Sequence, residues 1–343
     1  MSSNTPTNVW LIIDSLAFGG IESHVVQLAK GLKQFEASVF VWIVRKYDAP
    51  PALCEHLDAN DIPHNFLADR PLQSLPTLLS HIKQRSPDVI HAHGYKASLL
   101  AKAARLTTGI HQVSTYHAGE TPVGLVYLYD IIDRYTAALS STSIAVSALI
   151  QEKLPCRSTY LNNFVDSHYS SPIHGHQTAF VGRLSHEKAA DRFVSMGHMF
   201  PDQAFDIYGT GPDQDQLSHT APENVRFHGY QSDMEQVWPQ IDVLIICSRF
   251  EGLPMTALEA MARGIIVMSL NVGNLAKLIQ HGQNGYLFDD FSALCEFYSG
   301  FQTLPDSELN QVRLNAQQTI QHSFSPQALI PKLLEIYRPN ESI

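Results

Sequence analysis

Cysteine is scarce in this sequence, and its few copies lie far apart. Cys54, Cys156, Cys247 and Cys295 are scattered over 343 residues, and no C-x-x-C pair occurs. This spacing argues against a zinc ribbon or a thioredoxin-type site. Cys247 lies in the apolar run DVLIICS, which is typical of a small buried residue. We therefore expect reduced thiols and a reducing compartment.

Long hydrophobic runs and an export signal are also missing. The N-terminal stretch MSSNTPTNVWLIIDS has no basic region and only a short apolar run, so it predicts a disordered lead followed by a strand. No apolar stretch is long enough to cross a bilayer. We expect a cytoplasmic protein, and the sequence leaves a peripheral membrane contact open.

Positive charge is in the minority. Lys and Arg total 23 against 33 Asp and Glu, which gives a formal net charge of −10. That balance argues against non-specific binding of nucleic acid, so no nucleic-acid partner is expected. The chain is 44% hydrophobic and 16% charged, as in folded globular proteins. Its length suits two domains better than one.

Short apolar runs alternate with helical patterns along the whole chain. Before residue 166 the predicted strands are VWLIID, SVFVWIV, DVIHAHG, HQVSTYHA, SIAVS and STYLNNF. After residue 178 they are TAFVG, AFDIYG, VRFHGY, DVLIICS, GIIVMSL and GYLFD. Alternating strands and helices predict an α/β protein with two parallel, doubly wound, Rossmann-like sheets.

The domain boundaries follow from a break in this pattern. Residues 167–177, SHYSSPIHGHQ, are polar and lack periodicity, as expected for a linker. We therefore predict an N-terminal domain over 1–166 and a C-terminal domain over 178–324. Residues 325–343 begin with Ser-Pro and predict a terminal amphipathic helix and tail.

Two candidate ligand loops follow the first strand of each predicted domain. Gly19 and Gly20 would let a backbone approach a ligand, but DSLAFGGIE is not G-x-G-x-x-G and a plain tight turn fits as well. In FVGRLSHEK, Arg183 and Lys188 follow a strand that ends at Gly182. Two cations near a helix start could hold a diphosphate, or could be solvated charges beside a neighbouring glutamate.

The stretch SRFEGLPMTALEAMARG, residues 248–264, carries two glutamates eight positions apart. We predict a helix over 255–263 with Pro254 as its first residue. The free N–H groups at its start could face phosphate, and Glu251 lies just before it.

Glu259 lies inside that helix and has two interpretations. It shares a face with Thr256 and Arg263, so it could form part of an exposed polar stripe with a Glu259–Arg263 pair contributing about 0.2–0.5 kcal/mol. Alternatively, its carboxylate could accept hydrogen bonds from the two vicinal hydroxyls of a ribose.

Histidines and acids elsewhere give weaker signals. His117 follows a strand and could bond a substrate hydroxyl, although a histidine satisfied by its own surroundings is the commoner case. His91 and His93 have the spacing of a metal pair on a strand, but no third ligand is near in sequence. No metal site is therefore predicted. The D-x-D at Asp213 and Asp215 is explained by the dipole at a helix start.

Taken together, these motifs resemble the retaining glycosyltransferases of family 4, which have the GT-B fold. The strongest match is the E-x₇-E stretch from Glu251 to Glu259, and the resemblance covers nearly the whole chain. Further matching segments, weak singly but specific in order and spacing, are VGRLSHEK, YGTGPDQDQL, NVRFHGY, NNFVD and HGQNGYLFDD. The fold implied is two Rossmann-like domains facing a cleft, with the C-terminal helix returning to the N-terminal domain.

The resemblance also implies roles for matched residues. Arg183 and Lys188 would neutralise the donor diphosphate, and Glu259 would bind the ribose. Glu251 would contact hydroxyls of the transferred sugar, with His117 near the same sugar. The other donor contacts implied are Gly19, Gly20, Gly182, Tyr230, Leu253, Met255 and Thr256. The acceptor would lie near His93, Tyr95 and Lys96, where Lys96 is left open between an anion contact and a solvated charge.

One departure concerns the donor loop. Relatives often have Gly-Gly-x-x-Glu after the next strand, whereas this chain has Asn274 in place of the second glycine and Lys277 in place of the acid. The change puts the identity of the donor in doubt, and could also lower activity.

The function predicted is a metal-independent, retaining glycosyltransferase. It would move a sugar from a nucleoside-diphosphate sugar to a glycan or lipid-linked acceptor of the cell envelope, with no cofactor. Two alternatives remain: a non-catalytic sugar-binding or nucleotide-sugar-binding protein, and a nucleotide-sugar epimerase of the same fold.

Overall fold

The computed structural model describes residues 7–16, 18–48, 50–117 and 125–338, so the start of the predicted N-terminal lead and the last five residues lie outside it. These residues form two compact units. The first unit combines residues up to Phe164 with the segment from Pro326 onward, and the second covers Val165–Ser325.

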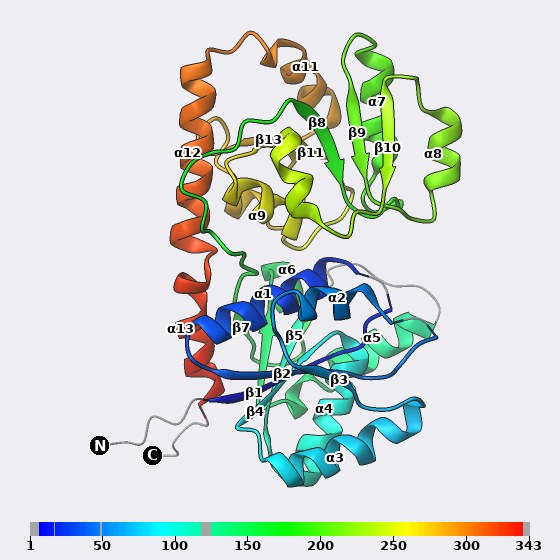
Figure 1. The fold of residues 1–343 in the computed structure, drawn as a ribbon, viewed down its shortest axis with the longest axis vertical. Coiled ribbons are helices and arrows are strands. Elements are labelled where there is room, and N and C mark those ends of the chain that lie inside the picture. Colours follow the sequence, from blue (N-terminus) through cyan, green and yellow to red (C-terminus); the bar gives the residue numbers. More distant parts are fainter. Residues whose placement is uncertain (1–6, 17, 49, 118–124, 339–343) are drawn as a thin grey trace. The chain divides into compact units, whose positions relative to one another are not determined.

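The first unit is built on a seven-stranded parallel sheet in the order β3-β2-β1-β4-β5-β6-β7 (Figure 1). Its strands are β1 Asn8–Ile13, β2 Ser38–Ile43, β3 His64–Phe66, β4 Val89–His93, β5 His111–Tyr116, β6 Thr142–Ala145 and β7 Thr159–Tyr160. The strand order reverses between β1 and β4. At such a switch point the loops after neighbouring strands diverge and leave a crevice where ligands bind.

Helices cover both faces of this sheet, which explains why β1 and β2 are apolar along almost their whole length (Figure 1). One core lies under α1, α2 and α13, and the other lies under α3 and α4. The helices of the unit are α1 Gly20–Gln34, α2 Ala52–Asp58, α3 Ser74–Arg85, α4 Tyr95–Thr108, α5 Leu125–Tyr135, α6 Ala148–Lys153 and α13 Pro326–Tyr337, with short 3₁₀ turns at Pro71–Gln73 and Ala137–Leu139.

The second unit repeats the design with a six-stranded parallel sheet in the order β10-β9-β8-β11-β12-β13. Its strands are β8 Gln177–Val181, β9 Phe205–Tyr208, β10 Val225–Gly229, β11 Ile241–Ile246, β12 Ile266–Leu270 and β13 Tyr286–Phe288. Its helices are α7 Ala190–Met199, α8 Gln214–Thr220, α9 Met255–Ala262, α10 Leu275–Leu278, α11 Phe291–Phe301 and α12 Asp306–Ser323, with 3₁₀ turns at Met234–Gln236 and Trp238–Gln240. Here the strand order reverses between β8 and β11, so this is the expected ligand edge.

The C-terminal helix belongs to the first unit, as the resemblance implied. Leu329, Ile330 and Leu333 of α13 are buried in the core shared with α1. Tyr337 is 1% exposed and its hydroxyl is hydrogen-bonded to His91 at 2.7 Å. Each buried leucine or isoleucine stabilises this packing by about 1.5–3 kcal/mol, so α13 is an integral part of the first unit.

Some elements differ from the sequence expectation. The short edge strand β3 was not predicted, because HNF has neither length nor alternation. Only Thr159–Tyr160 of the predicted strand STYLNNF pairs in the sheet. Pro254 caps α9 from outside, with ψ of 130°, rather than occupying its first turn. Within the polar segment 167–177, the N–H of Ile173 bonds to the carbonyl of Arg263, so this segment lies against the second unit.

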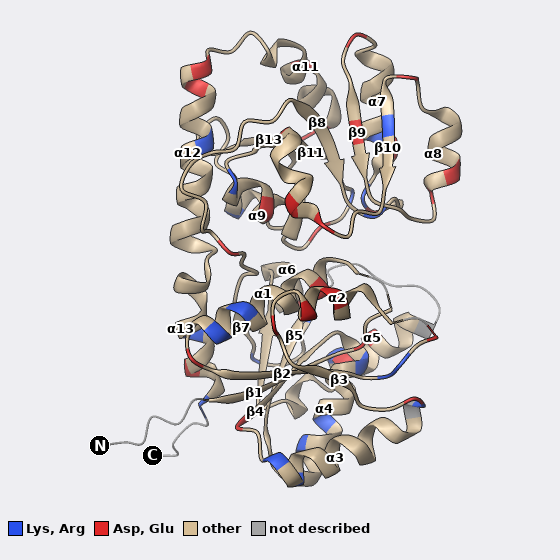
Figure 2. Cartoon of the chain, viewed as in Figure 1, with Lys and Arg blue, Asp and Glu red and all other residues tan. Residues whose placement is uncertain are grey.

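Charged side chains are interspersed over both units. In Figure 2, Lys and Arg are seen on α1, α3, α4 and α12, and Asp and Glu on α2, α8, α9 and α12. None of the helices in the described ranges combines the length and apolar character needed to cross a membrane.

Candidate donor and acceptor sites

A buried ion pair occupies the switch point of the second unit. Lys188 follows β8 and Glu251 follows β11, and these two strands are neighbours in the sheet. The Lys188 Nζ lies 2.7 and 2.8 Å from the two carboxylate oxygens of Glu251. The hydroxyl of Ser248 donates to the same carboxylate at 2.7 Å. The sheet therefore brings together two predicted site residues that lie far apart in the sequence.

The burial of this pair is uneven. The side chain of Glu251 is 6% exposed, whereas that of Lys188 is 30% exposed. Arg183, in the same loop as Lys188, is exposed. The loop after β8 thus carries two cations that reach solvent, and Lys188 of this loop contacts a carboxylate that is held in place. This combination suits an anionic ligand bearing hydroxyl groups.

Helix α9 begins beside Glu251, as predicted. Leu253 and Met255 are buried at 4% and 5% exposure, and Thr256 is half-buried. The N–H groups of Met255 and Thr256 have no carbonyl four residues earlier within the helix. The start of α9 thus offers backbone donors and the positive end of a helix dipole to an anion.

The predicted polar stripe on α9 is wrong at Arg263. That side chain is 5% exposed and donates to the backbone oxygen of Glu259 at 2.8 Å and to the carboxylate of Glu235. The guanidinium also lies over the rings of Tyr169 and Trp238. Arg263 is therefore a buried residue that links α9 to neighbouring segments. Half-buried Glu259 does not form an exposed stripe with it.

The loop that departs from the family pattern lies directly against Glu251. Gly273 has φ of 61°, and a Cβ built there would lie 2.2 Å from the backbone oxygen of Glu251. The N–H of Asn274 donates to the oxygen of Gly252 at 2.8 Å, and Asn274 is 3% exposed. Lys277 is exposed on α10. Asn274 is thus part of the scaffold beneath the E-x₇-E stretch.

The remaining predicted donor residues of the second unit lie at strand ends. Gly182 follows β8, and its N–H bonds to the carbonyl of Tyr208 at 3.0 Å. Tyr230 follows β10 and is 47% exposed. The predicted helix dipole explanation for the D-x-D also fits, because Asp213 caps α8 and Asp215 lies in its first turn.

In the first unit, Gly19 and Gly20 form the start of α1. The N–H of Gly19 donates to the carboxylate of Glu22 at 3.1 Å, which is one half of a capping box. Glu22 is 9% exposed, and burial raises its pKa. One backbone donor of this glycine turn is therefore already taken by a side chain of the same helix.

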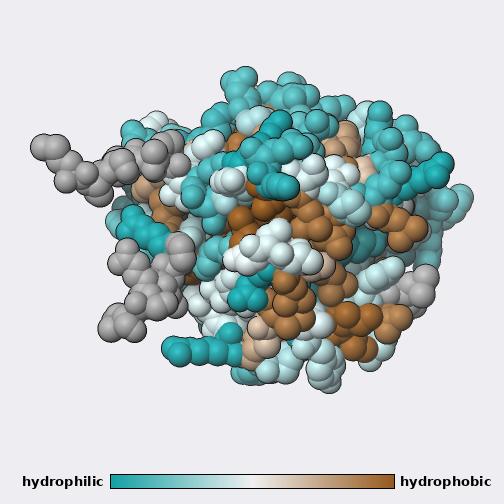
Figure 3. All heavy atoms as spheres, turned by 90° about the horizontal axis from the view of Figure 1, so that it is seen from below, coloured by the Kyte–Doolittle hydropathy of each residue, from teal (hydrophilic) through white to brown (hydrophobic). Residues whose placement is uncertain are grey.

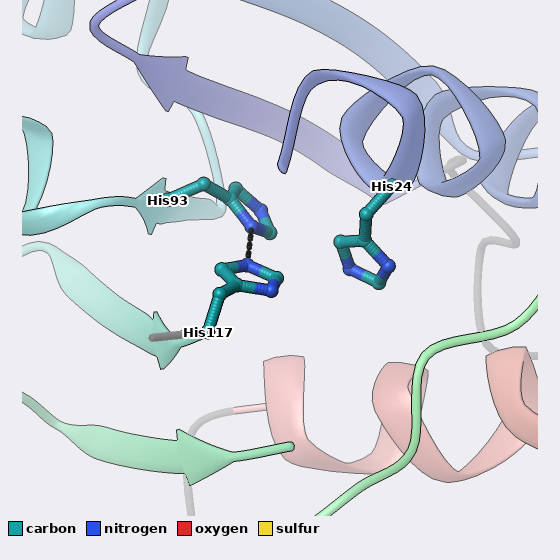
Figure 4. Close-up of side chains that lie close together, drawn as sticks. All are labelled: His24, His93 and His117. Atoms are coloured by element: carbon teal, nitrogen blue, oxygen red, sulfur yellow. Dashed lines mark hydrogen bonds between the residues drawn. The ribbon is translucent and has the colours of Figure 1, made fainter. Parts of the chain in front are cut away.

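Three histidines meet at the carboxyl ends of the central strands (Figure 4). His93 ends β4, His117 follows β5, and His24 comes from α1. The Nδ1 of His93 and the Nε2 of His117 are 3.0 Å apart. The ring of His24 meets that of His117 edge-on at 4.9 Å between centroids.

These imidazoles are neutral around pH 7. Burial, reinforced by the neighbouring histidines, places the pKa values of His93 and His117 well below the ordinary 6.5. Burial lowers the pKa of His24 to about 4. One nitrogen from each ring lies within 4.8 Å of the others, which is a spacing that a metal ion could use. The sequence pointed to His91 and His93 instead and missed His24, which lies far away on α1.

His91 is not available as a ligand. Its Nδ1 bonds to the hydroxyl of Tyr337 at 2.7 Å and its Nε2 to the hydroxyl of Thr115 at 2.6 Å. Both ring nitrogens are thus engaged in joining α13 to the sheet.

The predicted acceptor residues Tyr95 and Lys96 begin α4, at the switch point of the first unit. The Nζ of Lys96 lies 2.6 Å from the carboxylate of Asp14, which follows β1 and also accepts from Tyr47. Tyr95 stacks on Tyr129 of α5 with centroids 6.0 Å apart. Lys96 is therefore paired with an acid while its side chain stays 38% exposed. The sequence reading did not name this partner, Asp14.

Comparison with known proteins agrees with this geometry. Residues 18–159 match the family described as Glycosyltransferase Family 4, and residues 175–299 match the family described as Glycosyl transferases group 1. Together the matches define the class of this protein as a glycosyltransferase with the GT-B fold. The chain belongs to glycosyltransferase family 4, whose members are retaining enzymes.

Named relatives cover most of the chain. The UDP-Gal:α-D-GlcNAc-diphosphoundecaprenol α-1,3-galactosyltransferase of Escherichia coli is 21% identical over 84% of this chain and 82% of its own length. The D-inositol 3-phosphate glycosyltransferase of Pseudarthrobacter chlorophenolicus is 24% identical over 86% and 84%. Among solved structures, Anabaena HepE in complex with UDP-glucose is similar in fold, with a TM-score of 0.81, 19% identity and coverage of 95% of this chain and 98% of HepE.

Proposed function

We propose that this enzyme transfers a sugar from a nucleoside-diphosphate sugar to a hydroxyl group of an acceptor, with retention and without a metal ion. The observation that carries the proposal is the Lys188–Glu251 pair beside the start of α9. Within one unit, a buried and oriented carboxylate can bind hydroxyl groups. Two cations and the N–H groups at the start of α9 can bind a diphosphate.

Each group has a place on the donor in this proposal. Arg183, Lys188 and the N–H groups of Met255 and Thr256 bind the diphosphate. Glu251 accepts hydrogen bonds from hydroxyls of the transferred sugar, and Glu259 does so from the ribose. Tyr230 lies against the nucleobase. His117 donates a hydrogen bond to a hydroxyl of a sugar substrate.

The chemistry follows from the charge that develops during transfer. The bond between the anomeric carbon and the diphosphate oxygen breaks, so negative charge grows on the leaving phosphate. Preorganised cations and helix N–H groups stabilise that charge. The acceptor hydroxyl attacks from the face that the phosphate leaves, and its proton passes to the phosphate oxygen. Glu251 is paired with Lys188 and serves in binding rather than as a nucleophile.

For the acceptor, we propose a glycan or lipid-linked sugar of the cell envelope. The E. coli relative is named for a diphosphoundecaprenol-linked acceptor. Exposed apolar and aromatic side chains gather on α5 at Val126, Tyr127, Leu128, Tyr129 and Ile132. Apolar side chains also reach the surface seen in Figure 3. The exposed apolar side chains of α5 support peripheral contact with a membrane, and we propose a cytoplasmic location for the enzyme.

Binding of a donor panel tests the proposal. UDP-, GDP- and ADP-sugars are titrated into the full chain, and the melting temperature is followed as a function of concentration. One nucleotide series should raise the melting temperature, and Arg183→Ala should weaken that response about tenfold or more because it removes a charge-assisted contact to phosphate. Lys332→Ala, on the exposed surface of α13, is the matched control and should respond as wild type. A panel with no stabilising nucleotide, or an equal response from Arg183→Ala, would contradict the proposed donor site.

A further inference from the structure

The hydrogen bond between His93 and His117 constrains where each ring carries its proton. It joins the Nδ1 of His93 to the Nε2 of His117 at 3.0 Å. Among the described residues, His93 is the only hydrogen-bond partner of His117. The other nitrogen of His93, Nε2, is buried and has no partner in the described chain. Figure 4 shows the two rings facing each other, with His24 beside them.

Both rings are neutral, so the bond needs one N–H and one lone pair. Burial lowers the pKa of each ring well below 6.5, and the histidines packed around them, His24 and His91, lower it further. A neutral imidazole carries one N–H, so the donor at one nitrogen fixes a bare lone pair at the other. Only two arrangements therefore satisfy the observed contact.

The burial of the Nε2 of His93 helps to decide between these two arrangements. If His93 accepted through Nδ1, its proton would lie on Nε2 as a buried N–H without an acceptor. If His93 donates from Nδ1, its Nε2 is an unused lone pair. Among buried backbone groups, an orphaned N–H is rarer than an under-satisfied acceptor, and by analogy the second arrangement is favoured here.

We infer that His93 is a positioning residue: it donates its Nδ1–H to the Nε2 of His117 and holds His117 in the tautomer that carries its proton on Nδ1. Resting on the proposed function, the role of His117 is then that of a neutral N–H donor to an oxygen of a sugar substrate. It is not a base at that position. His24 packs edge-on against the His117 ring and restricts its rotation.

A shared metal ion is the competing use of the same three histidines. Two imidazole nitrogens bound to one tetrahedral zinc at about 2.0–2.1 Å would be about 3.3 Å apart, whereas 3.0 Å is normal for an N–H hydrogen bond. Metal-bound histidines also donate their second N–H to an acceptor. The Nε2 of His93 and the Nδ1 of His24 have none among the described residues. The geometry therefore favours a proton between His93 and His117.

Nuclear magnetic resonance on the ¹⁵N-histidine-labelled full chain tests this inference directly. Long-range ¹H–¹⁵N spectra report which imidazole nitrogen is protonated, and the signals are assigned by their loss in single variants. We expect His117 protonated on Nδ1 and His93 protonated on Nδ1. A His117 ring protonated on Nε2 would overturn the inference, and so would one-to-one binding of Zn²⁺ from dilute ZnCl₂ that shifts all three rings.

Two variants of His93 separate positioning from mere packing. His93→Asn keeps an N–H near the position of Nδ1, whereas His93→Leu fills space without a donor. We expect His93→Leu to give a mixture of His117 tautomers and to lower kcat about tenfold or more with little change in donor KM. His93→Asn should preserve the Nδ1–H tautomer and most of kcat, and His219→Asn, exposed on α8, is the control.

The two readouts distinguish the inference from the proposed function. Equal tautomer mixtures and equal kcat in His93→Asn and His93→Leu would show that His93 only fills space. The expected tautomers without turnover on any nucleotide sugar would leave the positioning geometry intact and contradict the proposed function instead.

Discussion

At the scale of single residues, Glu251 is the side chain whose surroundings say most about the site. A carboxylate with 6% exposure is stable only when charges and donors surround it, and here Lys188 and Ser248 supply them. Removing one partner of such a buried pair commonly costs about 3–5 kcal/mol. Changes at Lys188 therefore affect stability as well as ligand binding, and Glu251→Gln is the gentler probe of the carboxylate.

Gly273 gives a prediction about the same carboxylate. Gly273→Ala would place a methyl group against the backbone of Glu251 and add the strain of a left-handed residue, about 1–2 kcal/mol. We expect this variant to fold with a lowered melting temperature and to bind donor several-fold more weakly, as measured by calorimetry. Gly282→Ala has φ of 74° but open space at the Cβ, so it should lower stability alone. Equal donor affinity in both variants would show that Gly273 does not support the site.

Buried His24 gives a prediction for pH. Its pKa is about 4 in the folded chain because of burial, against 6.5 when unfolded. Between pH 6.5 and about 4, His24 is protonated in the unfolded chain but neutral in the folded chain. The free energy of unfolding therefore falls as the pH decreases through this range. Melting temperature against pH should show a shallower fall over this window in His24→Gln than in wild type. His219→Asn, at an exposed position, should keep the wild-type slope.

At the scale of secondary-structure elements, a buried ion pair holds α4 against α5. The Nζ of Lys102 contacts the carboxylate of Asp133 at 2.6 Å and its carbonyl at 2.7 Å, and it also donates to the hydroxyl of Tyr116. The Lys102 and Asp133 side chains are 2% and 6% exposed. Helix α5 presents apolar side chains to solvent, so this pair is a principal anchor for the surface proposed to contact a membrane.

The prediction for this anchor is a strongly non-additive pair of mutations. Asp133→Leu alone leaves a buried ammonium group and should destabilise the first unit by about 3–5 kcal/mol. Adding Lys102→Met removes the uncompensated charge, so the double variant should recover much of the loss. Thermal unfolding followed by circular dichroism measures both. A double variant no more stable than Asp133→Leu would show that packing, rather than charge, holds the two helices together.

Sequence periodicity predicted the long elements well and the short ones poorly. The runs VWLII and VLIIC are apolar throughout because both faces of a parallel sheet are covered, and this signal is local. β3 is too short to carry a pattern, and its pairing depends on β2. For the site, the E-x₇-E stretch and Lys188 could be named from sequence. Their pairing depends on β8 and β11 being neighbours, which sequence spacing does not reveal.

The residues that the sequence reading missed share a physical reason. Asp14 directly follows β1 and His24 lies on α1, the next helix. They contact residues on α4 and β4 because the strand order reverses between β1 and β4. One of the two interpretations of α9 put Arg263 on an exposed polar stripe, because it lies at helical spacing from Thr256 and Glu259. Its burial depends on Glu235, Tyr169 and Trp238 from other parts of the chain.

At the scale of the whole molecule, two units of the same topology carry different groups of candidate site residues. The second unit carries the cations and the E-x₇-E glutamates, and the first carries the histidines and the proposed acceptor residues. In the proposed chemistry, the negative charge of the diphosphate is neutralised by Arg183, Lys188 and the N-terminus of α9, and no metal ion is needed. Transfer should therefore continue at full rate after dialysis against EDTA, measured as release of the nucleoside diphosphate. A loss of rate restored by Mg²⁺ or Mn²⁺ would contradict metal independence.

Sugar transfer by matched variants tests the central claim most directly. The full chain and Glu251→Gln are assayed with the nucleotide sugar that binds best and an envelope-type lipid-linked acceptor, with Glu335→Gln on the surface of α13 as control. We predict transfer with retention by wild type and control, and a loss of about 100-fold or more in kcat/KM for Glu251→Gln, because its contacts to the sugar hydroxyls tighten in the transition state. Undiminished transfer by Glu251→Gln would contradict the account, as would a product of inverted configuration.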